Sequence, residues 1–221
     1  MNLKEFFHNA SKDKVVMLVY INIAVFCLVR IMDFFSMMGI GTYQWLLGFL
    51  ALPSADFFYT MCNRPWSVGT YMFTHYDFIH IIFNMIALFW FGKLMSSLVG
   101  KHLVVPTYLV GGGAGAIAFF FAPTALVPAY SSMIGASASV MAIMLCVATL
   151  HPNVRVNLAF IGEVKLCWVA AAYLLIDILS IPGFSNVGGH VAHLGGALAG
   201  FILAKVWEAK GIPPEKRPNS N

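Results

Sequence analysis

The sequence predicts an all-α, polytopic membrane protein built as a bundle of six transmembrane helices. Of the 221 residues, 60% are hydrophobic and only 10% are charged, whereas soluble domains have about 45–50% and about 25% on the same measures. Six apolar stretches also have the length of about 17–25 residues that crosses the hydrocarbon core of a bilayer. They are residues 15–35, 70–92, 103–122, 133–150, 164–181 and 190–207.

Each stretch is expected to be a helix, because an isolated strand cannot satisfy its backbone N–H and C=O groups in lipid. The same composition excludes a disordered chain, a nucleic-acid-binding module and most soluble enzymes. The lipid bilayer is therefore the first expected partner of the chain.

The basic residues predict the orientation of the six helices. With the N-terminus in the cytoplasm, the loops on that side hold eleven of the thirteen Lys and Arg residues and leave Arg30 and Arg64 outside. Cytoplasmic loops characteristically carry such an excess. We therefore expect a cytoplasmic segment at 1–14, a membrane domain at 15–207 and a cytoplasmic tail at 208–221, and this topology explains the net charge of +4 without a nucleic-acid partner.

One outer connection, residues 36–69, is long and rich in aromatic residues. Aromatic side chains combine an apolar ring with a polar edge and favour the depth of the lipid headgroups. We expect this segment to lie in the membrane interface, as a structural lid rather than a direct ligand contact.

Polar residues within the predicted spans gather toward the outer side of the bilayer. Such residues usually face the bundle interior or a wet cavity, because leaving them unpaired in lipid is costly. Ser137 lies about four residues into its predicted helix and His193 about three, so at 1.5 Å per residue both are about 5 Å below the same surface. The full set is His75, His80, Asn84, Ser137, Ser139, Asp177, His190 and His193.

Two of the predicted helices have surfaces that allow close packing. Residues 135–139 carry no side chain larger than that of serine, and His193 shares a helix face with Gly196 and Gly200. Small residues let helix backbones approach one another in membranes. The fourth and sixth helices are therefore predicted to pack together and to bring Ser137 into hydrogen-bond reach of His193.

A serine beside a histidine is typical of acyl-transfer chemistry, because the hydroxyl becomes a good nucleophile only when a base takes its proton. We predict Ser137 as the nucleophile and His193 as the general base and then general acid. The oxyanion would be held by the Ser137 N–H and by His80 and Asn84, which lie four residues apart on one helix face. Which way Asp177 faces does not follow from the sequence, so a dyad is expected rather than a triad.

Each feature also has a structural interpretation. A serine in a membrane helix, or Gly196 with Gly200, is more often a packing feature than part of a catalytic site. His80 and Asn84 could form a clamp between helices.

Two further histidines have structural interpretations as well, and one of them bears on whether the chain binds a metal. His75 and His190 are more often supporting residues than catalysts. His190 and His193 have a metal-ligand spacing but lack the glutamate of the zinc motif, so neither a metal nor another cofactor is predicted. The conjunction of the polar residues at one depth favours the catalytic interpretation.

The chain resembles the rhomboid family of intramembrane serine proteases. The resemblance is carried by HYDFIHIIFN at 75–84, GAS at 135–137 and AHLGGALAG at 192–200, in this order on alternate predicted helices. It implies a six-helix rhomboid-like bundle in which Ser137 is the nucleophile, His193 the base, and His80 and Asn84 the oxyanion-binding side chains.

The resemblance also bears on the surrounding residues. It implies that 36–69 is a membrane-embedded first loop and that 180–189 caps the site. Gly135 and Ala138 flank the motif serine, and Ala138 and Ser67 stand where many members have glycine and arginine. Ser139 is about 200° around the helix from Ser137 and cannot also face His193.

The sequence therefore predicts a serine endopeptidase that cleaves transmembrane segments of other membrane proteins through an acyl-enzyme. Its substrates should have helix-destabilising residues near the cut, because a carbonyl must leave its helical hydrogen bond to react. An inactive rhomboid-like protein that binds transmembrane helices is the alternative, and a small transporter or channel is a third. The compact chain predicts a bacterial plasma membrane location.

Overall fold

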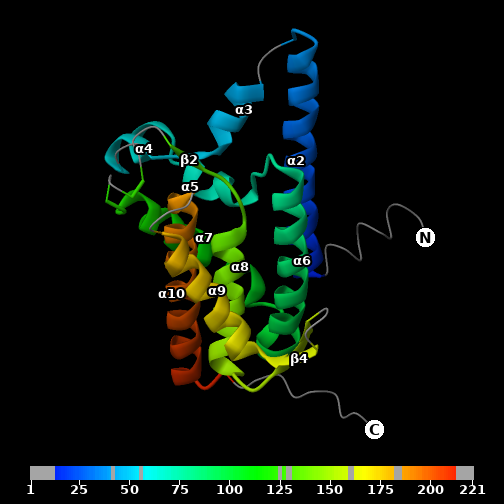
Figure 1. Ribbon diagram of the computed structural model, residues 1–221, viewed down its shortest axis with the longest axis vertical. Coiled ribbons are helices and arrows are strands. Elements are labelled where there is room, and N and C mark those ends of the chain that lie inside the picture. The colour runs from blue at the N-terminus through cyan, green and yellow to red at the C-terminus, as the bar shows by residue number, and fades with distance from the viewer. Residues whose placement is uncertain are drawn as a thin grey trace, which may run out of the picture.

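The computed structural model describes residues 13–40, 43–54, 57–123, 126–127, 131–158, 162–181 and 186–212. Six apolar helices form a bundle with α8 at its centre (Figure 1). This confirms the all-α prediction. The six are α2 (Lys14–Met37), α6 (Phe78–Met95), α7 (Val104–Phe120), α8 (Ser137–Leu150), α9 (Leu166–Ser180) and α10 (Val187–Ala209).

The six helices differ in length. Helices α2 and α10, and α6 together with its π-helical continuation η2 (Ser96–Gly100), are long and apolar enough to cross a membrane. Helices α7, α8 and α9 have 17, 14 and 15 residues, which at 1.5 Å per residue is about 21–26 Å. The second and fourth helices are shorter than their apolar stretches, which run from 70 and 133, because each begins only after a loop.

The helix starts are set by local backbone geometry. Helix α6 begins after Asp77, whose side chain accepts a hydrogen bond from the backbone N–H of His80 at 2.8 Å. Before α8, strand β2 (Ser132–Met133) pairs antiparallel with β1 (Leu52–Pro53), and Gly135 has a φ of +121°. These features are incompatible with a continuous helix, although the residues themselves are apolar enough to extend one.

The connection between α2 and α6 contains short helices beside one end of the bundle (Figure 1). In chain order they are α3 (Tyr43–Leu50), α4 (Phe57–Asn63), α5 (Ser67–Thr70) and the 3₁₀-helix η1 (Tyr71–Phe73). The segment expected as a single aromatic loop is thus largely helical in its described part.

Two side chains of this connection, Arg64 and Trp66, form hydrogen bonds with backbone carbonyls in and just after α3. Arg64 donates to the backbone carbonyls of Gly48 and Ala51. Trp66 donates its ring N–H to the carbonyl of Phe49 at 2.9 Å and stacks on the Phe49 ring, with 4.8 Å between centroids. The arginine that contacts α3 is thus Arg64, which comes before Trp66 in the chain. This contact therefore does not require an arginine at position 67, where the chain has serine.

The core of the bundle is the packing of α8 against α7 and α10. A Cβ on Gly196 or Gly200 would collide with the carbonyl oxygen of Ala138 or Ala142. The backbones of α8 and α10 therefore touch, which confirms the predicted packing of the fourth and sixth helices. On the other side of α8, a Cβ on Gly115 of α7 would lie 2.6 Å from the Cβ of Ala138.

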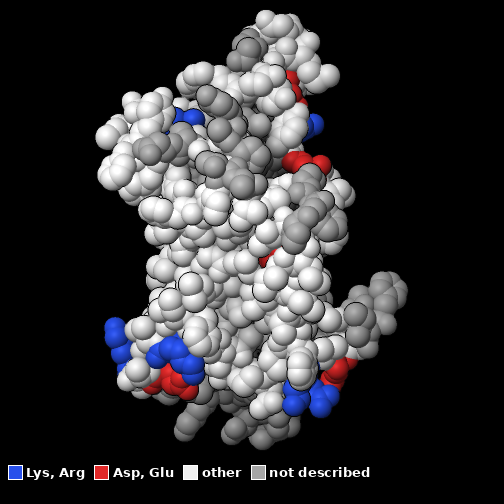
Figure 2. All heavy atoms as spheres, turned by 60° about the vertical axis from the view of Figure 1, so that its left-hand side comes forward, with Lys and Arg blue, Asp and Glu red and all other residues white. Residues whose placement is uncertain are grey.

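Charged side chains gather at the two ends of the molecule and leave an apolar band between them (Figure 2). Helix α2 begins and α10 ends at the same end of the bundle (Figure 1). That end also holds the hairpin of β3 (Arg155–Leu158) and β4 (Gly162–Lys165). The arrangement agrees with the predicted six crossings, while the side of the membrane that each end faces stays a prediction.

Candidate active site

The backbone around Ser137 places its side chain at the mouth of a cavity. Ser137 is the first residue of α8, and His193 is the seventh residue of α10 rather than about the third. The predicted positions, about four and about three residues into the two helices, were therefore wrong. Helix α10 begins earlier and α8 later than the hydropathy pattern indicates, and the two side chains are nevertheless in contact.

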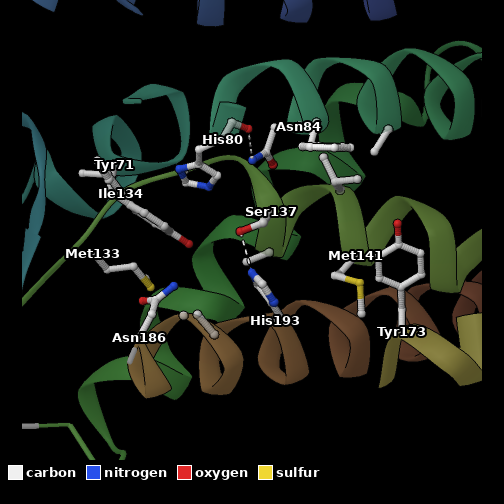
Figure 3. Close-up of a pocket in the computed structure, with 17 residues that line it drawn as sticks. Tyr71, His80, Asn84, Met133, Ile134, Ser137, Met141, Tyr173, Asn186 and His193 are labelled. Carbon is white, nitrogen blue, oxygen red and sulfur yellow. Dashed lines mark hydrogen bonds between the residues drawn. The ribbon is translucent and has the colours of Figure 1, made fainter. Parts of the chain in front are cut away.

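Ser137 and His193 are in hydrogen-bond contact, with 2.6 Å between Ser137 Oγ and His193 Nε2 (Figure 3). The other ring nitrogen of His193, Nδ1, lies 2.9 Å from Oδ1 of Asp177. Asp177 is buried in α9, with 4% of its surface exposed. The structure therefore differs from the predicted dyad by adding a carboxylate behind the histidine.

The direction of Asp177 escaped sequence analysis because it depends on the rotation of α9 relative to α10. One signal was present: it is a lone carboxylate in an apolar stretch, and such residues usually have a partner. His190, one helical turn before His193, is the second partner, with its Nδ1 2.8 Å from the same Asp177 oxygen.

His80 and Asn84 lie across the cavity from His193 and project from α6 on the Ser137 side (Figure 3). Asn84 donates a hydrogen bond from its side chain to the backbone carbonyl of His80 at 2.9 Å. A side-chain amide has a second N–H, so this contact leaves Asn84 one donor. The residues expected at an oxyanion site thus border the same cavity as Ser137.

The cavity has a volume of about 300 Å³. Its lining is mixed, with the polar groups of Ser137, His193, His80 and Asn84 on two sides. Sequence analysis did not single out several other lining residues, which are the polar Asn186 and the larger apolar and aromatic residues Tyr71, Phe83, Met133, Ile134, Met141 and Tyr173. It can accommodate a polypeptide side chain beside a reacting carbonyl.

His75 supports the site from outside the cavity. It is fully buried, and its Nε2 accepts a hydrogen bond from the backbone N–H of Ala136 at 3.3 Å. The Gly135 N–H donates to the carbonyl of Tyr71 at 2.9 Å. Both contacts hold the backbone just before Ser137. The contact of His75 with Ala136 agrees with the supporting role expected of His75.

Ser139 contacts a residue outside the cavity, whereas Ala138 lines the cavity and packs against α7. Ser139 is fully buried, and its hydroxyl lies 3.8 Å from the sulfur of Met72. The methyl group of Ala138 packs where Gly115 of α7 has no side chain. A glycine on the facing helix thus accommodates the extra methyl group of Ala138, next to the nucleophile position.

Asp177, His190 and His193 have metal-ligating atoms within 4.8 Å of one another, the one such group among the described residues. The two short N–H···O contacts already pair these atoms. Direct hydrogen bonds therefore account for the arrangement.

Comparison with known proteins relates most of the chain to one family. Residues 63–208 match the family model described as Rhomboid domain. The chain is 32% identical to RHOMBOID-like protein 12, mitochondrial, of Arabidopsis thaliana, over 87% of its own length and 58% of that protein. It is 27% identical to the human Presenilin-associated rhomboid-like protein, mitochondrial, over 81% of its own length and 44% of that protein.

A third relative is Presenilin-associated rhomboid-like protein A, mitochondrial, of Danio rerio, at 31% identity over 58% of this chain and 34% of that protein. The chain thus spans between about a third and three fifths of these relatives' lengths. All three are mitochondrial by name, which contradicts the expected bacterial plasma membrane. That expectation rested on the compactness of the chain, which does not distinguish one membrane from another.

Proposed function

The chain belongs to the rhomboid family, and from that premise and the geometry of the site we propose that it is an intramembrane serine endopeptidase. The observation that carries the proposal is the 2.6 Å contact between Ser137 Oγ and His193 Nε2 at the wall of a cavity. The names of the relatives support a mitochondrial membrane as its location.

The first half of the reaction forms an acyl-enzyme. Ser137 Oγ bonds to the carbonyl carbon of the substrate while its proton passes to His193 Nε2, and the carbonyl electron pair becomes an oxyanion. Donors near that oxygen stabilise it, and the backbone N–H of Ser137 with His80 and Asn84 would supply them. The oxyanion then reforms the carbonyl, the C–N bond breaks, and Nε2 returns the proton to the leaving amine.

The second half hydrolyses the ester. Water attacks the acyl carbon, gives its proton to His193 Nε2, and the Ser137 oxygen leaves and takes that proton back. The products are a new carboxylate and a new amine, and the enzyme returns to its starting state. No step in this sequence uses a cofactor.

The substrate class follows from the same chemistry. A peptide carbonyl inside a membrane helix is already hydrogen-bonded and sterically covered, so it must leave the helix before Ser137 can reach it. We propose that substrates are membrane proteins whose spans contain Gly, Pro or small polar residues near the cut.

Cleavage of a tagged single-span substrate by the purified protein in detergent tests the proposal. The wild type and Ser139→Ala should cut a span that contains a Gly-Pro break, whereas Ser137→Ala and His193→Ala should lose at least about 1,000-fold in rate, as expected when a nucleophile or its base is removed. A poly-Leu span serves as the matched control substrate and should resist cleavage.

Mass spectrometry of the fragments then locates the cut bond. Cleavage that survives Ser137→Ala, or that requires zinc to recover from a chelator, would contradict the serine mechanism. A silent wild type against several helix-destabilised substrates would favour a protein that only binds such helices.

A further inference from the structure

We infer that Asp177 is a positioning residue that fixes His193 in the tautomer required of a base, and that His190 holds Asp177 in place. The inference rests on the proposed function and deepens it, because it enlarges the Ser137–His193 pair to a four-residue hydrogen-bonded chain across α8, α9 and α10. Three contacts form that chain, of 2.6, 2.9 and 2.8 Å.

The tautomer follows from which groups can donate. An ionised carboxylate only accepts hydrogen bonds, so at 2.9 Å from Asp177 the Nδ1 of His193 must carry a hydrogen. In a neutral imidazole the other nitrogen, Nε2, then has a free lone pair. Nε2 lies 2.6 Å from Ser137 Oγ, and its lone pair can accept the hydroxyl proton.

Without Asp177 the opposite tautomer becomes available. His193 could then carry its hydrogen on Nε2 and donate it to the oxygen of Ser137, an arrangement in which the serine keeps its own proton. Asp177 also stabilises the imidazolium that forms when His193 takes the proton, because opposite charges attract strongly where little water is present.

His190 restrains the carboxylate. His190 and His193 lie three residues apart on α10, so both face α9, and both Nδ1 atoms contact the same oxygen, Asp177 Oδ1. The second oxygen, Oδ2, is buried without a hydrogen-bond partner. Turning or shifting the carboxylate plane away from this orientation would break both hydrogen bonds at Oδ1, so the pair of histidines restrains its orientation.

Three further titratable groups line the cavity with His193, and they matter for the pH dependence of the test. Tyr71 comes from η1, His80 from α6 and Tyr173 from α9. None of them changes in the variants of Asp177 and His190, so a shift in pH profile between those variants and the wild type reports on the chain of four.

The first experiment measures the rate at which a fluorophosphonate probe labels Ser137 in detergent between pH 5 and 9. For Asp177→Asn we expect a loss of about 100-fold to 10,000-fold, as for the equivalent change in soluble serine proteases. The pH profile should also change its inflection, because the imidazole has lost the carboxylate that contacts it. His190→Ala should lose about tenfold, and His190→Asn, which keeps a donor near the position of Nδ1, should recover most of it.

The matched control is Asp33→Asn in α2. Asp33 is also a buried carboxylate, but its partners are Arg30 at 3.0 Å and Tyr76 at 3.3 Å, away from the cavity. This variant should keep the wild-type rate and the wild-type inflection. Asp177→Asn with both quantities unchanged would overturn the inference and leave the Ser137–His193 pair to act alone.

A second measurement is independent of activity. ¹⁵N spectra of histidine-labelled protein distinguish a protonated from an unprotonated ring nitrogen, and we expect His193 to be protonated at Nδ1 in the wild type and to lose this preference in Asp177→Asn. An identical His193 tautomer in both proteins would overturn the inference. Probe labelling that is absent from the wild type would instead contradict the proposed function, while the spectra still decide the role of Asp177.

Discussion

Gly135 is the residue at which the backbone before Ser137 is most constrained. Its φ is +121°, a value that side chains with a Cβ rarely adopt, and a Cβ there would lie 2.7 Å from the His80 ring. We expect Gly135→Ala to lower the cleavage rate by about 10-fold to 100-fold, because a displacement of about 1 Å near the reacting groups costs this much. The measurement is the cleavage assay with thermal unfolding of the same sample.

Gly162, the first residue of β4, provides the control. It has a φ of +90° but nothing within 4 Å of its Cβ position. Gly162→Ala should therefore lose about 1–3 kcal/mol of stability through backbone strain alone and keep its cleavage rate. Equal activity in both variants would show that the His80 position does not depend on Gly135.

Residue by residue, the sequence predicted the polar groups better than their directions. Ser137, His193, His80 and Asn84 were assigned to one cavity from helix spacing, and the structure brings them to one cavity. Asp177 lies three residues before the end of α9 and packs onto α10 only because of how α9 is rotated, which no local pattern reports. The support that His75 gives to Ala136 depends likewise on tertiary packing.

Among the helices, α8 and α10 approach closely through their backbones, since a Cβ on Gly196 or Gly200 would collide with a carbonyl oxygen of α8. Gly196→Ala would place a methyl group against the carbonyl of Ala138, and overpacking of this kind costs about 1–3 kcal/mol. We expect a lower melting temperature in detergent together with a lower cleavage rate, because α8 carries Ser137 and α10 carries His193.

Gly113 of α7 is the matched position, since a Cβ there has nothing within 4 Å. Gly113→Ala should leave stability unchanged or raise it, because alanine is the better helix former by about 0.8–1 kcal/mol. If both variants melt at the same temperature, the close approach of α8 to α10 does not stabilise the bundle.

Asp13 caps the N-terminus of α2 and links it to α6. Its side chain accepts from the N–H of Val15 at 3.0 Å and also accepts from Lys93. Partial burial acts to raise the pKa of Asp13, but the hydrogen bond from Lys93, the backbone N–H donors and the Lys93 charge together lower it below the ordinary value of 3.8. Since the folded pKa is the lower one, this stabilisation is present above the unfolded pKa and is lost as the pH falls through the folded value.

Asp13→Asn keeps an oxygen that can cap the helix but removes the charge. We expect its melting temperature at pH 7 to be slightly below that of the wild type, because a largely exposed ion pair contributes little. The difference should shrink as the pH is lowered through 4 and below. A difference that is independent of pH would show that the capping hydrogen bonds alone matter.

Helix boundaries show what hydropathy can and cannot predict. The apolar stretch 70–92 was expected as one helix, yet the chain turns at Thr74, which has extended backbone angles, and α6 begins only at Phe78. The Asp77 cap was visible in the sequence, because an aspartate before an apolar run is a typical helix start. The pairing of β1 with β2 was not, since it joins residues about 80 positions apart.

For the whole molecule, the distribution of charge is the property that fixes its place in a membrane. The end where α2 begins and α10 ends also holds the β3–β4 hairpin, with Arg155 and Lys165 at its two ends. Figure 2 shows charged side chains at both ends, with more Lys and Arg at the hairpin end than at the end beside α3 and α4. An excess of Lys and Arg marks the side from which a chain is inserted, so α4 and the mouth of the cavity should face the opposite compartment.

This orientation can be measured by labelling single cysteines in sealed vesicles of one orientation. In a background without the native cysteines, Lys14→Cys and Lys210→Cys should react with a membrane-impermeant maleimide from the same side. A chain that retains only Cys62, which is exposed on α4, should react from the other side. Detergent-permeabilised vesicles give the total labelling for each variant. Labelling of positions 14 and 210 from opposite sides would contradict an even number of crossings. Labelling of Cys62 from the same side as position 14 would contradict a cavity that opens away from the basic end.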